Sequence, residues 1–415
     1  MTTVHTPQPT TLRAHTRVVA SDDELLRLLP GSAGALAWVM RGEGLVGWGE
    51  AARFEPAGPR RFELADQWWR EFAESVTCTD EVRLPGTGPV AFVSLAFADE
   101  PGSSVLVVPE VIVGRRDGVT WVTEIGQPSG GAFQSVQPVR RPEVVRYSEG
   151  ELAVTGYRRA VAEAVRRMRS GELAKVVLAH DLVATTDVEV DARFLLHGLA
   201  QRYPSCWVFS VDGLVGATPE MLLRRQDSAV FSRVLAGTMW PRPGVTAEEL
   251  AAELLGSAKN RAEHEFAIRS MVESLAPHCC SMTVSPQPYV LRLPNVVHLA
   301  SDVTGALAED ASLLRLAAAV HPTAAVGGTP RAAAVAAIGE LEGMDRGRYA
   351  GPVGWVDANG DGEVGIALRC AQVSGRTVRL FAGGGMVPES DPDTEVAEAA
   401  AKMIPIRDAL EGVDH

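Results

Sequence analysis

The sequence predicts an α+β fold. Short apolar runs separated by Gly- and Pro-bearing turns fill residues 36–125, which is the pattern of antiparallel strands. Amphipathic stretches that begin with capping residues follow, and these predict helices. The two kinds of element do not alternate in regular βαβ order, and no fixed-period repeat is present. The pattern therefore favours α+β over a doubly wound parallel fold.

The first part of the chain predicts a flexible tail followed by a β-rich subdomain. Residues 1–18 are polar and rich in Pro and Thr, so we expect a flexible tail there. Within residues 19–145, strands are predicted for the runs LAWVM, VAFVSLAFA, SVLVVPEVIV and VTWVTEI, and one helix is predicted for residues 61–76. The Gly-, Pro- and Ser-rich stretch 127–142 predicts a surface loop. This part shows no chemical motif.

The second part, residues 146–412, contains three helix-start signals: the pairs Ser148 and Glu151, Thr246 and Glu249, and Asp391 and Pro392. They predict a basic amphipathic helix ending near residue 171, a long helix ending near residue 275, and a last helix ending near residue 410. Strands are predicted for the segments AKVVLAHDLVA, GPVGWVDANGDGEVGIALRCAQV and RTVRLFAGGGMV.

Composition excludes several classes of function. The 415-residue chain has 39 Lys and Arg against 52 Asp and Glu, a formal net charge of −13, so nucleic acid is not an expected partner. No apolar run approaches the roughly 18 residues of a membrane span, and the N-terminus lacks the apolar core of a signal peptide. We expect a cytoplasmic protein without a membrane partner. The five cysteines form no CxxC pair, which indicates reduced packing residues.

Lys175 opens an apolar strand and is a candidate general base. A lysine at a strand end can simply extend its ammonium group to solvent. The functional alternative is a desolvated amine whose pKa falls towards neutrality, which would raise the fraction able to accept a proton at pH 7.

Glu220, in the segment GATPEMLLRR, is a candidate general acid. Burial would raise the pKa of its carboxyl group and keep it protonated, as a general acid requires. The alternative is a surface ion pair with Arg224 or Arg225.

Acidic residues of the last predicted helix suggest a metal site. Glu395, Glu398 and Lys402 lie within about a 60° arc of one helix face. They form either a solvated stripe or, if Glu263 of the preceding long helix joins them, a cluster that only a cation would hold together. All-oxygen ligands with an incomplete shell suit Mg²⁺.

A last set of residues offers hydrogen-bond donors to an anion. Arg369 has a planar fork that fits a carboxylate, although a cross-strand salt bridge would explain it equally. Tyr349 precedes a Gly-Pro turn. Gly383, Gly384 and Gly385 would let a ligand approach bare backbone N–H groups.

Together these stretches resemble the chorismate-utilising enzymes, which include isochorismate synthase, salicylate synthase, anthranilate synthase component I and aminodeoxychorismate synthase. The matching segments span about residues 151–402 in family order: GELAKVVLAHDL, GATPEMLLRR, LAGTMWPRPG, SAKNRAEHEF, LPNVVHLASDVTG, HPTAAVGGTPRAAA, RYAGPVGWVDANGDGEVGIALRCAQV and RLFAGGGMVPESDPDTEVAEAAAK. The resemblance implies one large α+β unit of two extensive antiparallel sheets packed as a sandwich, with peripheral helices. Residues 146–412 would then be the chorismate-binding catalytic region.

The resemblance also implies a role for each candidate residue. Lys175 would activate water, and Glu220 would protonate the departing hydroxyl. Glu263 and Glu398 would ligate Mg²⁺, and Glu395 would act on the metal through a water molecule or through contact with its direct ligands. The enolpyruvyl carboxylate would be bound by Tyr349, Arg369 and Gly383, Gly384 and Gly385, and the pocket would be lined by Gly237, Thr238, His298 and Lys402.

Few positions distinguish the branches of the family. Ammonia-using relatives usually have Gln at the position of Lys175, and the aminodeoxychorismate branch has a nucleophilic Lys at the position of Ala236, so water is the implied nucleophile. The segments YAGPVGW and IALRCA resemble isochorismate synthases most. We therefore expect an isochorismate synthase that feeds menaquinone or siderophore biosynthesis, acting as a monomer without an amidotransferase subunit. The alternatives are a salicylate synthase and a non-catalytic chorismate-binding paralogue.

Two positions depart from the family pattern. His180 stands where relatives often have Arg, and Asn260 stands where many have an acid. The first leaves local anchoring open, and the second would weaken the surroundings of the metal.

Overall fold

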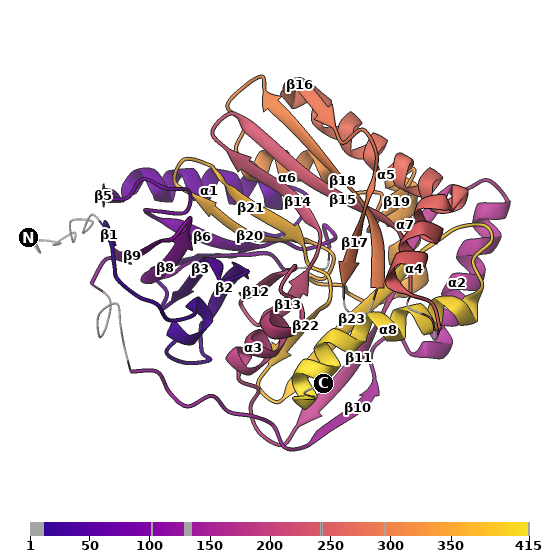
Figure 1. Ribbon diagram of the computed structural model, residues 1–415, viewed down its shortest axis with the longest axis horizontal. Helices are drawn as coiled ribbons and strands as arrows, with labels where there is room; N and C mark the ends of the chain where they lie inside the picture. Colours follow the sequence, from indigo (N-terminus) through magenta and orange to yellow (C-terminus); the bar gives the residue numbers. More distant parts are fainter. Residues whose placement is uncertain are drawn as a thin grey trace, which may run out of the picture.

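The computed structural model describes residues 12–100, 103–127, 135–240, 242, 244–293 and 296–413. They form two large sheets with helices around them (Figure 1). Among these residues every strand pairing is antiparallel except that of β1 (Arg13–Val18) with β5 (Thr77–Asp80). The predicted α+β fold of two antiparallel sheets is confirmed.

The first sheet has 13 strands. Its order is β10 (Val145–Glu149), β11 (Lys175–Thr186), β23 (Thr377–Met386), β22 (Cys370–Ser374), β13 (Leu214–Thr218), β12 (Trp207–Val211), β2 (Leu36–Met40), β3 (Glu43–Trp48), β8 (Val111–Arg116), β9 (Val119–Ile125), β1 and β5, and β19 (Gly328–Thr329) pairs with β11.

The second sheet has 10 strands. Its order is β16 (Cys279–Val284), β18 (Val296–Leu307), β15 (Ala229–Met239), β14 (Met221–Gln226), β21 (Gly362–Ile366), β20 (Pro352–Asp357), β6 (Val90–Ser94), β7 (Val105–Val108) and β4 (Ala52–Phe54), and β17 (Tyr289–Leu293) pairs with β18.

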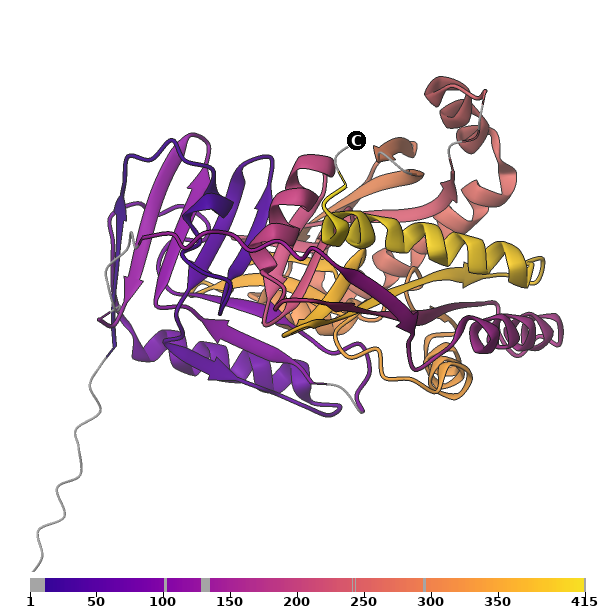
Figure 2. The ribbon, with the colours of Figure 1, turned by 90° about the horizontal axis from the view of Figure 1, so that it is seen from below.

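The two sheets share one hydrophobic core. Apolar residues of both sheets belong to a single buried cluster, and a buried hydrogen bond crosses between them: Trp38 Nε1 of β2 donates to Glu363 Oε2 of β21 at 2.8 Å. The strands of the first 125 residues gather at one end of the molecule, and most of the helices lie at the other (Figures 1 and 2).

In the described ranges eight α-helices surround the sheets: α1 (Arg61–Ser75), α2 (Val154–Arg169), α3 (Ala192–Arg202), α4 (Ala247–Gly256), α5 (Ala258–Leu275), α6 (Leu313–Val320), α7 (Arg331–Glu342) and α8 (Pro392–Glu411). Two short 3₁₀ turns, η1 (Leu25–Leu28) and η2 (Ala276–His278), complete the described elements. Helix α8 packs on β23 and on α2, whereas α5 packs on β15 and β18. These contacts bring α5 and α8, which are far apart in sequence, to the same end of the two sheets.

The flexible tail predicted for residues 1–18 is wrong for its last third. Arg13–Val18 forms β1, which pairs with β5 and β9. Its alternating pattern buries Ala14 and Thr16, and Thr16 Oγ1 lies 2.7 Å from Thr123 Oγ1. Residues 1–11 lie outside the described ranges.

The capping box predicted at Ser148 is also wrong. Ser148 lies in β10 opposite Val183 of β11, and α2 begins later, after Ala153. The N–H of Glu151, which the capping box assigned to the Ser148 hydroxyl, donates instead to the Asp181 carboxylate at 3.0 Å. A side chain distant in sequence has replaced the local cap.

The other helix signals are confirmed with one change. Thr246 and Glu249 form the predicted capping box of α4, and Asp391 caps α8. The predicted long helix over residues 246–275 is divided at Ser257, which ends α4 and caps α5 by accepting from the N–H of Asn260. Part of the predicted loop 127–142 lies outside the described ranges, and residues 135–142 contain neither helix nor strand.

No helix in the described ranges is long and apolar enough to cross a membrane. Both sheets contain strands from the two predicted subdomains, residues 19–145 and 146–412, so these parts share a core.

Candidate active site

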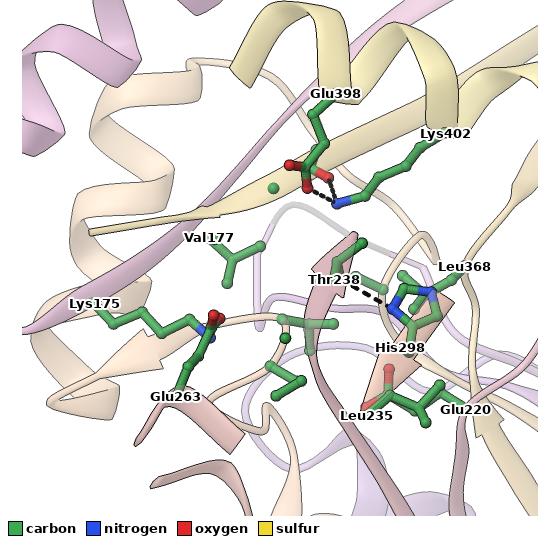
Figure 3. A pocket seen from close by; sticks show the side chains of 18 of the residues that line it. Lys175, Val177, Glu220, Leu235, Thr238, Glu263, His298, Leu368, Glu398 and Lys402 are labelled. Atoms are coloured by element: carbon green, nitrogen blue, oxygen red, sulfur yellow. Dashed lines mark hydrogen bonds and ion pairs between the residues drawn. The ribbon is translucent and has the colours of Figure 1, made fainter. Parts of the chain in front are cut away.

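One cavity of about 190 Å³ lies where β11, β15, β18 and β23 approach α5 and α8 (Figure 3). All fourteen residues that the sequence nominates line it: Lys175, Glu220, Gly237, Thr238, Glu263, His298, Tyr349, Arg369, Gly383, Gly384, Gly385, Glu395, Glu398 and Lys402. These residues come from positions up to 227 apart in sequence, and only the fold brings them together.

Lys175 begins β11 and points into the cavity rather than to solvent. The residue is 8% exposed, and Nζ lies 2.9 Å from Oε1 of Glu263 on α5. The alternative of a lysine extended to solvent is therefore wrong. The base candidate and one predicted metal ligand form an ion pair in this structure (Figure 3).

Glu220 occupies the turn between β13 and β14 and is 6% exposed. Burial raises the pKa of its carboxyl group to about 8, against the opposing charges of Arg369 and Lys175. The predicted protonated carboxyl is thus supported. The alternative surface pair is wrong, since Arg224 pairs with Glu363 at 2.9 Å and Arg225 with Asp361 at 2.6 Å.

Glu398 and Lys402 of α8 form a second ion pair in the cavity. Lys402 Nζ donates to Glu398 Oε1 at 2.5 Å and to the carbonyl oxygen of Gly383 at 2.8 Å. Glu395, one turn earlier on α8, is 8% exposed. The alternative of a solvated acidic stripe is therefore wrong for these residues, which face the cavity.

Two glycines of β23 lie between the acidic residues of α8 and Glu263 of α5. A methyl group at Gly384 would lie 2.9 Å from Glu395 Oε2 and 3.3 Å from Glu398 Oε1. At Gly385 it would lie 3.0 Å from Lys175 Cε and 3.7 Å from Glu263 Oε1. Because Gly384 and Gly385 have no side chains, the glutamates of α8 and Glu263 of α5 can all approach β23.

The donor chemistry of Glu263, Glu395 and Glu398 fits Mg²⁺, because three carboxylates from two helices face one cavity and supply only oxygen. Within the described ranges, however, no group of three or more His, Cys, Asp or Glu side chains is close enough to hold a metal ion. Lysine ammonium groups bond two of these carboxylates instead, Glu263 and Glu398.

His298 presents a neutral imidazole to the cavity. Its Nδ1 lies 2.9 Å from Thr238 Oγ1, and its Nε2 is buried with no hydrogen-bond partner among the described residues. Burial lowers its pKa well below the usual range, and the charges of Arg369 and Lys402 add to this effect. Gly237 permits the arrangement, because a bulge places it at φ +79° just before Thr238.

Tyr349 and Arg369 supply donors on the remaining side. Burial raises the pKa of Tyr349 to about 12, so its hydroxyl stays protonated, and its ring stacks on Phe381 with centroids 5.2 Å apart. Arg369 lies between β21 and β22 with φ +47°. Its guanidinium makes no ion pair or hydrogen bond to the described residues, so the alternative of a cross-strand salt bridge is not found.

The two departures from the family pattern have separate locations. His180 does not line the cavity; its ring lies 4.7 Å from that of Tyr157, and both are buried. Asn260 does line the cavity, and its Nδ2 donates to Ser257 Oγ at 3.0 Å where α5 begins.

Sequence reasoning missed one charged residue of the cavity wall, Arg346. Its sequence signal is a Glu four residues earlier, Glu342, and that spacing is also typical of exposed helix pairs. Burial, which distinguishes the two cases, is not visible in the local sequence.

The profile of the family described as chorismate binding enzyme matches residues 127–411. Isochorismate synthase DhbC of Bacillus subtilis is 35% identical over 332 residues, covering 76% of this chain and 79% of that protein. Isochorismate synthase MenF of the same organism is 30% identical over 404 residues, covering 89% and 85%. The solved structure of MenF from Escherichia coli, a menaquinone-specific isochorismate synthase, superposes with a TM-score of 0.80 at 25% identity, covering 96% and 94%.

The family match extends over more than half of the chain and includes every residue that lines the cavity. The similarity to MenF of Bacillus subtilis covers 89% of the chain and so extends beyond residues 127–411, and the solved structure of the Escherichia coli protein superposes over 96% of the chain. The chain therefore belongs to the chorismate-binding enzyme family.

Proposed function

We propose that this protein is an Mg²⁺-dependent isochorismate synthase that interconverts chorismate and isochorismate. The observation that carries the proposal is the pairing of an amine, Lys175, and a buried carboxyl group with a pKa of about 8, Glu220, on one cavity. Acid–base catalysis requires one group that accepts a proton and one that donates a proton on the same substrate.

The reaction replaces one hydroxyl group with another. Lys175 takes a proton from water as its oxygen forms a bond to C2 of the ring. Both ring double bonds shift, the C4–O bond breaks, and Glu220 gives its proton to the departing hydroxide, which leaves as water. One water is consumed and one is released, so the product is an isomer of the substrate.

Hydrogen-bond donors in the cavity wall would bind the carboxylates of the substrate. The enolpyruvyl carboxylate would lie against Arg369, the Tyr349 hydroxyl and the N–H groups of the β23 glycines, where a charged fork and neutral donors are available. The open Nε2 of His298 offers a further polar contact. The ring carboxylate would face the acidic helices.

Glu263 and Glu398 would hold the metal, with Glu395 acting through water. When bound, Mg²⁺ would neutralise the ring carboxylate and fix the diene. Lys175 donates to Glu263 in this structure, so it would have to leave Glu263 and give up a proton before it could act as a base. Mg²⁺ bound at Glu263 would take the place of the ammonium group as the counter-charge. The ion pair between Lys175 and Glu263 therefore supports the proposal that activity requires the metal.

The proposal predicts that purified protein with chorismate and Mg²⁺ forms isochorismate, resolved by chromatography. Removal of the divalent ion with EDTA should abolish turnover, and added Mg²⁺ should restore it. Lys175→Ala should lower kcat by at least about a hundredfold, since a general base contributes about 10²–10⁴. Full activity in this variant would remove Lys175 as the base.

The products also separate the rival functions. Salicylate and pyruvate without an added lyase would identify a salicylate synthase, whose reaction begins in the same kind of pocket. Tight chorismate binding without turnover would identify a non-catalytic paralogue. The proposed product would feed menaquinone or siderophore biosynthesis.

A further inference from the structure

One edge of β11 has a gap in its strand pairing next to Lys175. On that edge β19 pairs with Lys175 and Val176, and β10 pairs with residues 182–186. The opposite edge is paired with β23 along residues 176–185. Residues 177–181 therefore have no strand partner on the outer edge within the described part of the chain. The N–H of Val177 donates to the carbonyl oxygen of Gly327 at 2.9 Å, and the other backbone groups on this edge need other partners.

A buried ion pair fills this gap. The N–H of Ala179 donates to Glu342 Oε1 at 2.7 Å, and Arg346 Nη2 donates to the carbonyl oxygen of Val177 at 2.7 Å. Glu342 and Arg346 are joined by two hydrogen bonds of 2.9 and 2.5 Å. Two side chains thus replace the donor and the acceptor that a neighbouring strand would supply.

Arg346 also connects this edge to other walls of the cavity. Its Nη1 donates to the carbonyl oxygen of Val326 at 3.1 Å, and its guanidinium lies 4.3 Å from the ring centroid of Phe97. Its own carbonyl oxygen accepts from the N–H of Tyr349 at 3.0 Å. Val177, Val326 and Tyr349 all line the cavity. Arg346 is therefore the common partner of three separate wall segments.

Stability alone does not explain this pair. Side-chain exposures of 3% and 1% mean that both charges are fully desolvated. Desolvation of two ions largely offsets their attraction, so a buried pair is often no more stabilising than apolar residues of the same size. What apolar residues could not do is bond the backbone of β11 two and four residues after Lys175.

We propose that Arg346, held by Glu342, is a positioning residue that fixes β11 so that Lys175 faces the reacting carbon. This inference rests on the proposed role of Lys175 as base. An error of about 1 Å in the position of a reacting group can cost about a hundredfold in rate. The effect of disturbing the pair should therefore appear in kcat more than in KM.

The test compares Arg346→Lys with the matched surface variant Arg167→Lys. Lysine keeps the charge but lacks the planar fork that bonds Glu342 and Val177 together. Arg167 forms an i,i+4 pair with Glu163 of α2 and a two-pronged pair with Glu340 of α7, and it does not line the cavity. It therefore controls for the loss of a forked Arg–Glu pair away from the cavity. We expect kcat to fall about 10- to 100-fold in Arg346→Lys with KM within about threefold, and no change in Arg167→Lys.

A second measurement does not depend on turnover. Hydrogen exchange followed by mass spectrometry should show faster exchange of residues 176–181 in Arg346→Lys and in Glu342→Gln, with α2 unchanged. If the unmodified protein does not turn over chorismate, the proposed function fails, and exchange alone then decides on the positioning role.

Four results would overturn the inference. These are an unchanged kcat in folded Arg346→Lys, a raised KM with normal kcat, unchanged exchange of residues 176–181, and failure of both Arg346→Lys and Glu342→Gln to fold. The last result would make the pair a requirement of the fold alone. If only Arg346→Lys fails to fold, the same kinetic criteria apply to Glu342→Gln.

Discussion

At the scale of single residues, burial sets the chemistry of Glu220. No described side chain hydrogen-bonds its carboxyl group, and the cations that oppose its desolvation, Arg369 and Lys175, act only through space. A carboxyl group that keeps its proton to about pH 8 is a competent acid at neutral pH.

This pKa predicts an alkaline limit to activity. Below about pH 8 Glu220 carries the proton that it must donate, and above that pH the proton is lost, so kcat/KM for chorismate should decline with an apparent pKa of about 8. Steady-state rates between pH 6 and pH 10 test this. A flat profile to pH 10 in a folded enzyme would show that Glu220 is not the acid.

The same residue should limit stability. The folded-state pKa is raised, so the contribution of Glu220 to the free energy of unfolding is fully present below its ordinary value of 4.5 and is lost as pH rises through about 8. Glu220→Gln has no proton to lose. We expect this variant to be inactive. Its Tm should rise relative to the Tm of the unmodified protein as the pH increases from 5 to 9. A constant difference in Tm over this range would contradict the buried ionisation.

Residue identity predicted some of these roles and not others. Lys175 and Glu220 were recognisable because each interrupts an apolar strand segment, where a charged group has few explanations. Glu342 and Arg346 were not, because their i,i+4 spacing also describes Glu163 and Arg167, which lie away from the cavity and are only partly buried. Only tertiary contacts separate a positioning pair from a surface pair.

At the scale of elements, β23 contributes to the site through its glycines, which leave room for the glutamate side chains of α8. Gly383 faces the backbone of β11, and a methyl group there would lie 2.0 Å from the carbonyl oxygen of Leu178. Gly384 faces the ends of Glu395 and Glu398 instead. The two neighbouring glycines therefore lack a side chain for different reasons: at Gly383 the backbone of β11 fills the space, and at Gly384 the glutamates of α8 fill it.

Gly384→Ala should separate activity from stability. The added methyl group meets only the flexible ends of glutamate side chains, at 2.9 Å for Glu395, so the fold can adjust while the acidic group moves. We expect the Mg²⁺ concentration that gives half-maximal activity to rise at least tenfold, or activity to be lost, with Tm little changed. The control is Gly339→Ala in α7, where nothing lies within 4 Å and helix propensity should add about 0.5–1 kcal/mol. Equal kinetics for the two variants would contradict the role of Gly384.

Local signals predicted helix ends only where the cap is local. Thr246 and Asp391 cap their own helices, and both were identified from sequence. Ser148 has the same signature, yet the carboxylate of Asp181 accepts from the N–H of Glu151, which Ser148 would have capped, and from the N–H of Leu152. A partner thirty residues away cannot be found from a four-residue pattern.

At the scale of the whole molecule, two strand pairings join the two parts of the chain. In the first sheet β12 pairs with β2, and in the second β20 pairs with β6. All residues of β12 and β20 are buried. The apolar runs predicted the strands of residues 19–145, and the family resemblance implied two antiparallel sheets. Which strand lies beside which depends on contacts across more than 100 residues, and neither signal predicted it.

A fragment of residues 146–413 should therefore fail to fold on its own. Without the first part, β12 and β20 become apolar edges, and Glu363 loses the Trp38 N–H that it accepts across the core. Exposed apolar edge strands promote aggregation, so we expect insoluble protein, or a soluble fraction without a cooperative thermal transition by circular dichroism. The full chain under the same conditions is the control. A fragment that melts cooperatively and binds chorismate would show instead that residues 19–145 are dispensable to the catalytic region, although they share both of its sheets.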